Sequence, residues 1–186
     1  MSAPVARGHA FVSGGRVVYR WEQSLEDVTV RARLPPGAAA AHVACALGGG
    51  GNNVRLGLRG AGAPYLDART AGPIVADEST WFVEDADDDD TDDGAAGAAG
   101  GATAAAATAP RARQVTIVLV KARPGEAWPS AFAGHAPLDA EAHEADRKAI
   151  LLERFGAEHP GFDFRDAAVS GEVPDAREFM GGMRRA

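Results

Sequence analysis

The alternation of hydrophobic and polar side chains is strictest in the segment from Tyr19 to Pro36. Between positions 28 and 34 every second residue is apolar, which sets Val28, Val30, Ala32 and Leu34 against Thr29, Arg31 and Arg33. A period of two is typical of a strand with one buried and one solvated face. Pro35 ends the strand, because proline has no N–H to donate to a ladder. Upstream, Tyr19 and Trp21 share one face and are candidates for the core.

Seven short segments show strand-like patterns: residues 17–23, 25–34, 42–47, 54–58, 65–70, a sixth centred on 81–83, and 115–121. The first two follow each other so closely that they form either a tight hairpin or one strand bent at a bulge. No helical segment lies between any two of the seven, which excludes parallel βαβ units. The predicted fold class is therefore all-β, a seven-stranded antiparallel β-sandwich.

The last of these strands, VTIVLVK at 115–121, is apolar on both faces, which favours a central position in its sheet. The segment at 65–70 is short and polar, which favours an edge. Between the sixth and seventh strands, residues 85–113 are first acidic and then rich in Ala, Gly and Thr. This insertion lacks the apolar surface to offset the entropy of ordering, so we expect it to be a disordered loop.

Beyond residue 121 the pattern changes to that of a helix, expected over about 139–155. Asp139 is a suitable N-cap and Gly156 a suitable stop. One arc of this helix is apolar, although Ile150 falls on the polar side with Asp146. The apolar arc consists of Ala145, Ala149, Leu151, Leu152 and Phe155.

These patterns divide the chain into three parts. Residues 1–15 are small and polar and are expected to form a flexible N-terminal arm. Residues 16–122 form the sandwich domain that carries the insertion at 85–113. Residues 123–186 form a C-terminal extension that contains the helix and an extended tail.

Net charge changes this picture little. The chain carries −7, but the run EDADDDDTDD at 84–93 contributes eight acids and no base, so the rest carries +1. No basic stripe indicates nucleic-acid binding, and no segment is long and apolar enough for a membrane span. Cys45 is the single cysteine, which favours a reducing compartment, and we expect a soluble cytoplasmic protein without a signal peptide.

Catalytic and metal-binding patterns are missing from the sequence. His143-Glu144 lacks the second histidine of a zinc-protease motif, and the acidic run lacks the ligand order of a calcium loop. The glycine run at 48–51 is not followed by the Gly-Lys-Ser/Thr of a phosphate-binding loop. Cys45 lies among apolar residues, which favours a buried, inert thiol. The sequence therefore predicts no enzyme, no cofactor and no metal site.

A diffuse but extended set of motifs resembles the CS domain of the NudC family. The motifs are Tyr19-x-Trp21-x-Gln23, Gly57-Leu58-Arg59-Gly60, Glu78-Ser79-Thr80-Trp81-x-x-Glu84-Asp85, Leu152-Glu153-Arg154-Phe155, the segment from Glu158 to Phe164, and Ala168-Val169-Ser170-Gly171. The resemblance covers roughly residues 16–84 and 114–171. The insertion and the glycine-rich turn at 48–53 depart from the family pattern, and both are changes in loops.

The resemblance implies a CS-type antiparallel sandwich and a chaperone or co-chaperone role without enzymatic activity. Its implied partners are unfolded or client proteins, heat-shock protein 90 and factors of the dynein pathway. The residues expected to contact a partner are Trp21, Gln23, Arg59, Glu78, Trp81, Phe162 and Phe164. For each aromatic residue in this set, burial in the protein's own core is the competing interpretation.

Two further functions remain open from the sequence. A holdase of the small-heat-shock type would use a related sandwich, but its C-terminal Ile/Val-x-Ile/Val motif is absent from the tail EFMGGMRRA. A passive adaptor would only hold the tail for a partner. Large oligomers would favour the holdase, and tail binding without holdase activity would favour the adaptor.

Overall fold

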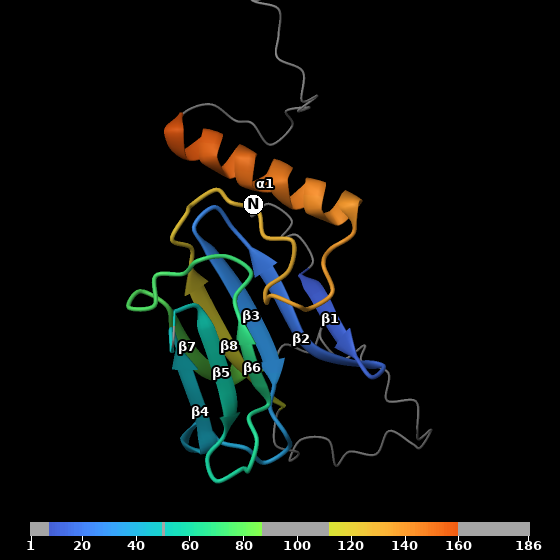
Figure 1. The fold of residues 1–186 in the computed structure, drawn as a ribbon, viewed down its shortest axis with the longest axis vertical. Helices are drawn as coiled ribbons and strands as arrows, with labels where there is room; N and C mark the ends of the chain where they lie inside the picture. The colour runs from blue at the N-terminus through green and yellow to red at the C-terminus, as the bar shows by residue number, and fades with distance from the viewer. Residues whose placement is uncertain (1–7, 50, 87–111, 160–186) are drawn as a thin grey trace, which may run out of the picture.

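The computed structural model describes residues 8–49, 51–86 and 112–159. This part of the chain forms two antiparallel sheets and one α-helix (Figure 1). The elements are β1 (His9–Ser13), β2 (Arg16–Gln23), β3 (Asp27–Arg33), the 3-10 turn η1 (Ala40–His42), β4 (Val43–Leu47), β5 (Asn53–Leu58), β6 (Leu66–Arg69), β7 (Thr80–Asp85), β8 (Arg113–Val120) and α1 (Ala140–Glu158).

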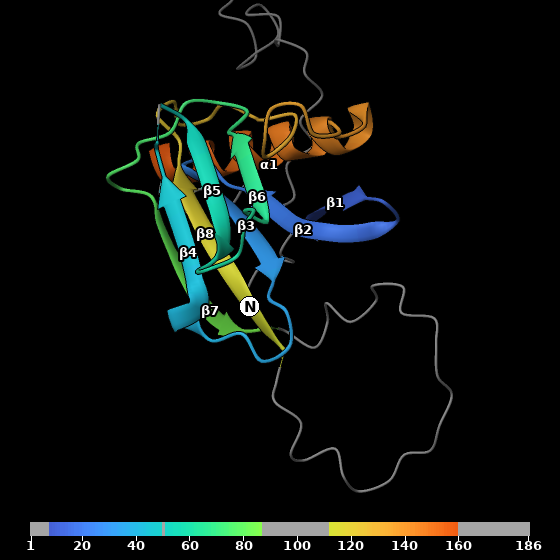
Figure 2. The ribbon, with the colours of Figure 1, turned by 60° about the horizontal axis from the view of Figure 1, so that its bottom comes forward.

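The larger sheet has the strand order β1-β2-β3-β8-β7, and the smaller sheet has the order β4-β5-β6. The sheets face each other as a sandwich, and the β1–β2 pair extends beyond the smaller sheet (Figure 2). The expected all-β antiparallel sandwich is confirmed. Strand β8 is central and β6 lies at an edge, as their sequence patterns predict. Strands β2 and β3 pair with Gln23 opposite Val28, so the two alternatives for this region resolve to a tight hairpin.

The core lies between the sheets and is built from the inward positions of the alternating strands. Tyr19 and Trp21 are 2% and 3% exposed, and Val28, Val30 and Ala32 are also buried. From the central strand, the side chains of Val115, Ile117 and Leu119 are fully buried. Inward residues at every second position of several strands pack into one cluster, which is the main stabilising feature of the fold.

Strand β1 is an addition to the seven expected strands. The expected flexible arm includes residues 9–13, yet these residues pair with β2 from His9 opposite Trp21 to Ser13 opposite Arg16. Only Phe11 and Val12 are large and apolar in this strand, so its own pattern is weak. Its pairing is decided by partners far along the chain, since the ring of Phe11 stacks on His135 with 4.2 Å between centroids.

The segment after β8 closes one end of the sandwich. Trp128 and Phe132 are 1% and 0% exposed. Phe132 bridges to Thr70 at the end of β6, so this segment ties the smaller sheet to the larger one. Gly72 is required here, because a Cβ at this position would lie 2.4 Å from Nε1 of Trp128. This packing matches the expectation that the two aromatics cover an end of the sandwich.

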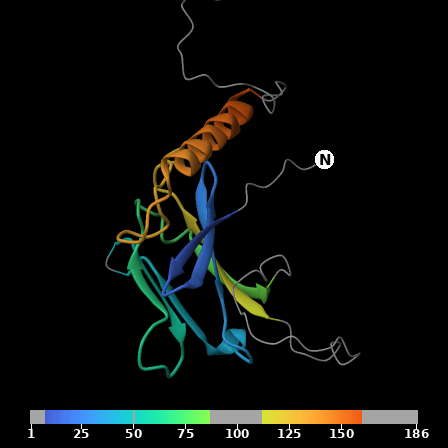
Figure 3. The same ribbon diagram turned by 90° about the vertical axis from the view of Figure 1, so that its right-hand side faces the viewer.

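Helix α1 lies across the same end and then runs away from the sandwich (Figures 1 and 3). Asp139 is the N-cap, accepting from the backbone N–H of Ala142 at 2.7 Å. The helix continues three residues beyond the expected end at 155, because Gly156 is accommodated within it instead of ending it.

The buried face of α1 differs from the predicted one. Asp146 and Ile150 are its buried residues, whereas Leu151 and Phe155 are 37% and 39% exposed. Hydrophobic periodicity selects the wrong face because a polar contact of Asp146, described below, determines how the helix docks. The disordered loop expected at 85–113 and the tail beyond 159 lie almost wholly outside the described residues, and the three-part division stays a prediction.

Candidate partner-binding site

Two of the expected partner-contacting residues meet at one hollow on the surface. The hollow has a volume of about 410 Å³ and is lined by residues of β4, β5, the β5–β6 loop and β7. Arg59 follows β5 in the smaller sheet, and Trp81 lies on β7 in the larger sheet. The two residues are distant in sequence and belong to different sheets, so only the sandwich brings them to the same place.

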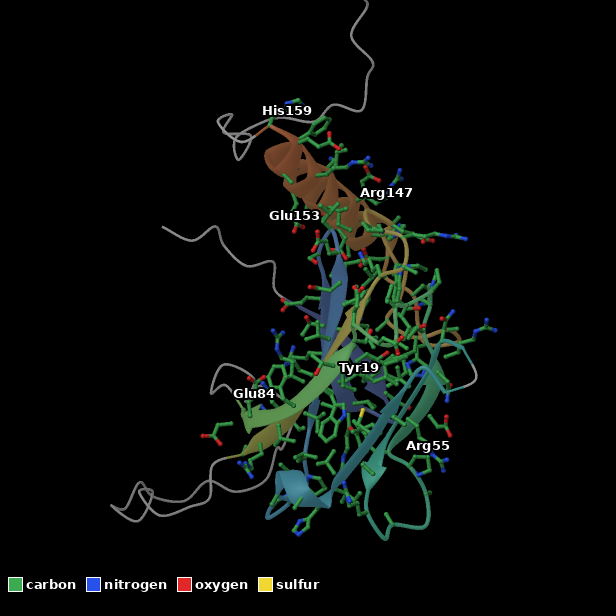
Figure 4. The ribbon with its side chains drawn as sticks, turned by 90° about the vertical axis from the view of Figure 1, so that its left-hand side faces the viewer. Tyr19, Arg55, Glu84, Arg147, Glu153 and His159 are labelled. Carbon is green, nitrogen blue, oxygen red and sulfur yellow. The ribbon has the colours of Figure 1, made fainter. Side chains whose placement is uncertain are left out.

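The hollow lies where an edge strand of each sheet is exposed. Strand β4 is an edge of the smaller sheet and β7 an edge of the larger sheet. Both strands lie on the same side of the molecule (Figure 1), and Figure 4 views that side, with Glu84 near the end of β7. The rest of the hollow is formed by the loop after β5, because Gly57 has no side chain and Pro64 packs against it.

The hollow combines small side chains with positive charge. Ala44 and Ala46 lie on its β4 side. In the described part of the chain its charged lining residues are Arg59 and Arg55, and Arg55 pairs with Asp67 at 3.7 Å. Arg59 is exposed and donates from Nε to the carbonyl of Val43 at 3.2 Å, which leaves its terminal nitrogens available to a partner. The arrangement suits an apolar group beside Trp81 and a carboxylate beside Arg59.

Trp21 does not contribute to this surface. It is 3% exposed, and its outer side is covered by His9, whose ring centroid lies 5.0 Å away. The expected partner contact of Trp21 is therefore wrong, because Trp21 is a core residue. The covering residue belongs to β1, the strand that the sequence pattern does not indicate.

Gln23 is also an internal residue. Its side-chain amide makes two hydrogen bonds to the backbone of Trp128, accepting from the N–H at 2.8 Å and donating to the carbonyl at 3.0 Å. It also donates to Asp146 of α1 at 2.7 Å, and Asp146 is bonded to His9 at 2.9 Å. This network joins β1, β2, the segment after β8 and α1, so Gln23 stabilises the fold and is removed from the partner surface.

Lys121 completes this internal network. It is 2% exposed, and its ammonium group donates to the carbonyls of Ser24 and Glu126 at 2.7 and 2.9 Å. Burial lowers the pKa of Lys121 to about 8. Nearby carboxylates raise this pKa in part, and Asp27 contributes most among them. Each donor bond goes to an internal acceptor, so the group serves the fold and not a catalytic step.

The remaining predicted residues lie elsewhere. Glu78 is exposed in the turn before β7 and does not line the hollow. Phe162 and Phe164 lie outside the described residues, so their contact with a partner stays a prediction.

The structure adds residues that the sequence motifs did not single out. Arg55 and strand β4 belong to the hollow. The sequence carried a signal for Arg55, because the alternation of Val54 and Leu56 places Arg55 on the opposite face of β5 from these buried residues. A second group is internal: the hydroxyl of Tyr19 is 2.7 Å from Nδ1 of His135. Burial raises the pKa of Tyr19 and lowers that of His135, which keeps both groups neutral at physiological pH.

The thiol at the hollow is not activated for catalysis. Cys45 lines the hollow, but burial raises the pKa of its thiol to about 11, so the nucleophilic thiolate is not formed at neutral pH. No group of three His, Cys, Asp or Glu side chains is placed to hold a metal ion anywhere in the described ranges. Within those same ranges, no helix is both long enough and apolar enough to cross a membrane.

Comparison with known proteins gives consistent results. Residues 17–88 match the family model of the CS domain. NudC domain-containing protein 2 from Homo sapiens is 28% identical over 173 residues, covering 92% of this chain and 91% of the relative, and the proteins of that name from Mus musculus and Rattus norvegicus match to the same extent.

Two solved structures also match. The solution structure of the CS domain of human KIAA1068 protein has a TM-score of 0.47 and 16% identity, covering 74% of this chain and 86% of that one. The nuclear movement protein from E. cuniculi GB-M1 has a TM-score of 0.39 and 14% identity, covering 63% of this chain and 100% of that one.

The CS match spans β2 to β7, the part of the sandwich that contains both Arg59 and Trp81. The similarity to the mammalian relatives extends over nearly the whole chain, including most of the region beyond the sandwich. Residues 17–88 thus resemble a CS domain, and the chain as a whole is similar to NudC domain-containing protein 2 of three mammals.

Proposed function

We propose that this protein is a non-enzymatic chaperone or co-chaperone that binds client or unfolded proteins. The observation that carries the proposal is the meeting of Arg59 and Trp81 at one open hollow of a CS domain. A surface that pairs an exposed cation with a half-buried aromatic residue is well suited to protein contacts, in which Trp and Arg are enriched. No nucleotide or metal takes part.

The NudC-family resemblance extends the proposal to partners and place. Heat-shock protein 90 and dynein-pathway regulators are the partners it suggests, and the single, unpaired Cys45 favours the cytoplasm. The alternative function is a non-enzymatic adaptor, in which a folded partner binds the hollow and no unfolded client is held.

A thermally unfolding enzyme provides the direct test. Malate dehydrogenase is heated with and without the full chain, without ATP, and its light scattering is followed. Suppression near a stoichiometric ratio supports the chaperone function. Absence of suppression together with a stable complex with purified heat-shock protein 90 supports the adaptor, and absence of both contradicts the proposal.

Two variants locate the activity. Arg59→Ala and Trp81→Ser remove the charge and the aromatic surface of the hollow, and each is expected to weaken suppression several-fold. Glu22→Ala is the matched control, since Glu22 forms a partly exposed ion pair with Arg31 on the larger sheet and does not line the hollow. If the control loses as much activity as the two hollow variants, the hollow is not the binding surface.

A further inference from the structure

We propose that an extended peptide segment of the client binds by adding a strand, antiparallel, to the free edge of β7. The biological partner in this proposal rests on the chaperone function proposed above, whereas the binding mode rests on the geometry of the sheet edge. The segment has apolar side chains at alternate positions and an acidic residue at its C-terminal end.

The hydrogen-bond pattern of the larger sheet shows which backbone groups of β7 point outward. In an antiparallel pair, residues alternate between exchanging two bonds with their partner and exchanging none. Ala86 donates to the carbonyl of Ala112 at 2.8 Å, so the bonded positions of β7 are Thr80, Phe82 and Glu84. The N–H and C=O groups of Trp81 and Val83 therefore point away from β8, toward the free edge.

The hydrogen bonds between β8 and β3, on the other side of β8, lead to the same assignment. Leu34 donates to the carbonyl of Arg113, and Lys121 donates to that of Glu26, so the odd-numbered residues of β8 bond to β3. The even-numbered residues of β8 are left for β7, which agrees with the assignment from Ala86. Three bonds, on both sides of β8, thus identify the same outward groups on the β7 edge.

Among the sheet edges in the described ranges, β7 is the most open to a new strand. Strand β1 has a bulge between Phe11 and Val12, and bulges hinder edge pairing. The end of β6 is occupied by the backbone of Ala133, which donates to Arg69 at 2.7 Å. Strand β7 pairs regularly over all six of its residues.

The remaining edge, that of β4, is partly blocked. The carbonyl of Val43 accepts from Arg59, and its N–H donates to Ala40. At the other end of β4, a Cβ on Gly48 would lie 2.4 Å from the Cβ of Ala76, so the loop before β7 packs closely there. Only Cys45 is left with a clear approach, which is too short for a ladder.

The side chains beside the β7 edge define the composition of the segment. A residue opposite Trp81 points to the inner side of the sheet, toward the hollow, where an apolar side chain packs against the indole. Arg59 at the hollow favours an acidic residue on the same inner face, two positions beyond the residue opposite Trp81. Asp85, at the other end of β7, pairs with Arg113 at 3.8 Å, so no charge preference follows there.

An antiparallel segment has its N-terminus beside Asp85 and its C-terminus beside Trp81. The probe is therefore the fluorescein-labelled octapeptide Lys-Val-Thr-Val-Thr-Val-Thr-Glu, in which the valines and the glutamate share one face. It is titrated with the full chain and followed by fluorescence anisotropy. Main-chain bonds supply affinity in this mode, and alternate side chains supply selectivity. The wild-type protein is expected to bind this peptide, and absence of binding overturns the proposal.

Val83→Pro is the test variant. It removes the outward N–H of the edge, and proline is tolerated at strand positions whose N–H faces away from the sheet. Its binding is expected to be weaker by tenfold or more. Ala10→Pro is the matched control, because Ala10 lies on β1 at the opposite edge of the sheet. Its neighbours His9 and Phe11 occupy the positions that bond to β2, so the N–H of Ala10 points away from the sheet. Equal weakening in the control overturns the proposal.

A second measurement leaves the protein unchanged, in case Val83→Pro fails to fold. In an antiparallel ladder, the inward-facing valines of the peptide direct their N–H groups to β7, and the threonines direct theirs outward. N-methylation of the three valines is expected to reduce affinity by tenfold or more, and N-methylation of the three threonines by less than threefold. Equal affinities of the two methylated peptides overturn strand addition.

The client assay separates this inference from the proposed function. If the wild-type chain suppresses aggregation and Val83→Pro suppresses it equally well, the chaperone function stands and strand addition as its mechanism is overturned. If the wild-type chain binds the peptide with the expected methylation pattern but suppresses nothing, strand addition stands and the chaperone function fails. Sedimentation that shows a dimer for the wild-type chain and a monomer for Val83→Pro overturns the peptide as occupant.

Discussion

At the scale of single residues, the most informative position is Gln23. Its side chain bonds inside the protein, although it belongs to a motif from which a partner contact was expected. Its amide bonds both to the backbone of Trp128 and to Asp146. An amide is suited to this role, because it can donate and accept at once. A motif residue can therefore be maintained for the fold, and its presence in a motif does not identify a binding surface.

Gln23→Ala is expected to lower the free energy of unfolding by about 2–4 kcal/mol, because it leaves the backbone N–H and C=O of buried Trp128 without partners and removes one of the two hydrogen bonds to Asp146. Glu22→Ala provides the control, since its ion pair with Arg31 is partly exposed and is expected to contribute about 1 kcal/mol or less. Chemical denaturation of the two variants measures the difference. Equal midpoints would show that the hydrogen bonds of Gln23 do not stabilise the fold.

Lys121 predicts a pH dependence of stability. Its pKa is about 8 in the folded chain, and an unfolded lysine has a value of about 10.4, so the unfolded state binds more protons between these values. The contribution of Lys121 to stability therefore rises with pH across this window, by up to about 3 kcal/mol. Below pH 8 both states are protonated, and the contribution is constant.

Denaturation of the wild-type chain and of Lys121→Met at several values from pH 7 to pH 10 isolates this effect. The difference in free energy of unfolding between the two proteins is expected to shift in favour of the wild type as the pH rises. Subtracting the variant removes the opposite effect of Tyr19 and Cys45, whose raised pKa values reduce stability at high pH. A difference that is independent of pH would mean that the amine is not desolvated.

At the scale of elements, the docking of α1 shows how a polar contact can override hydrophobic periodicity. His143, Asp146, Ile150 and Glu153 recur at helical spacing and face the rest of the protein. Three of them make polar contacts there, and Ile150 is buried. The sequence predicted that the helix exists and where it begins, but the choice of face depends on acceptors and donors contributed by β1 and β2.

Ile150→Ala and Leu151→Ala form a matched pair on this helix. Ile150 is 4% exposed and Leu151 is 37% exposed. Truncation at 150 is expected to cost about 2–4 kcal/mol, and truncation at 151 about 1 kcal/mol or less. Thermal unfolding of the two variants compares the faces directly, and a larger loss at 151 would restore the face that the periodicity predicts.

At the scale of the whole molecule, the sandwich is complete without the acidic insertion. Strands β7 and β8 pair in register as far as Asp85 and Arg113, and one further backbone bond joins Ala86 to Ala112. The ends that the insertion connects are therefore already adjacent, at a separation that a short hairpin loop can span.

Replacing residues 87–111 with the loop Gly-Asn-Gly-Lys is expected to leave the fold intact and to raise the free energy of unfolding by about 1–2 kcal/mol, because a shorter loop costs less closure entropy. Differential scanning calorimetry measures the transition. A Gly/Ser loop of the original length controls for charge, because it removes the acids without shortening the chain. Loss of the cooperative transition in the short-loop variant would show that the insertion is part of the fold.

The sequence by itself determined the sandwich, because period-two alternation, proline and glycine stops and a doubly apolar central strand are local signals. It also determined the N-cap at Asp139, since capping depends on neighbouring backbone groups. It could not determine strand β1, whose pairing depends on ring contacts with His135, more than a hundred residues away.

The tertiary structure alone decided which motif residues form a surface. Trp21 and Gln23 carry the same motif signal as Arg59 and Trp81, yet the first pair is enclosed by β1 and α1 and the second pair meets at the open edges of the two sheets. A side chain's exposure is set by which distant segments cover it. That covering depends on long-range packing and hydrogen bonds, which leave no periodic trace in the sequence.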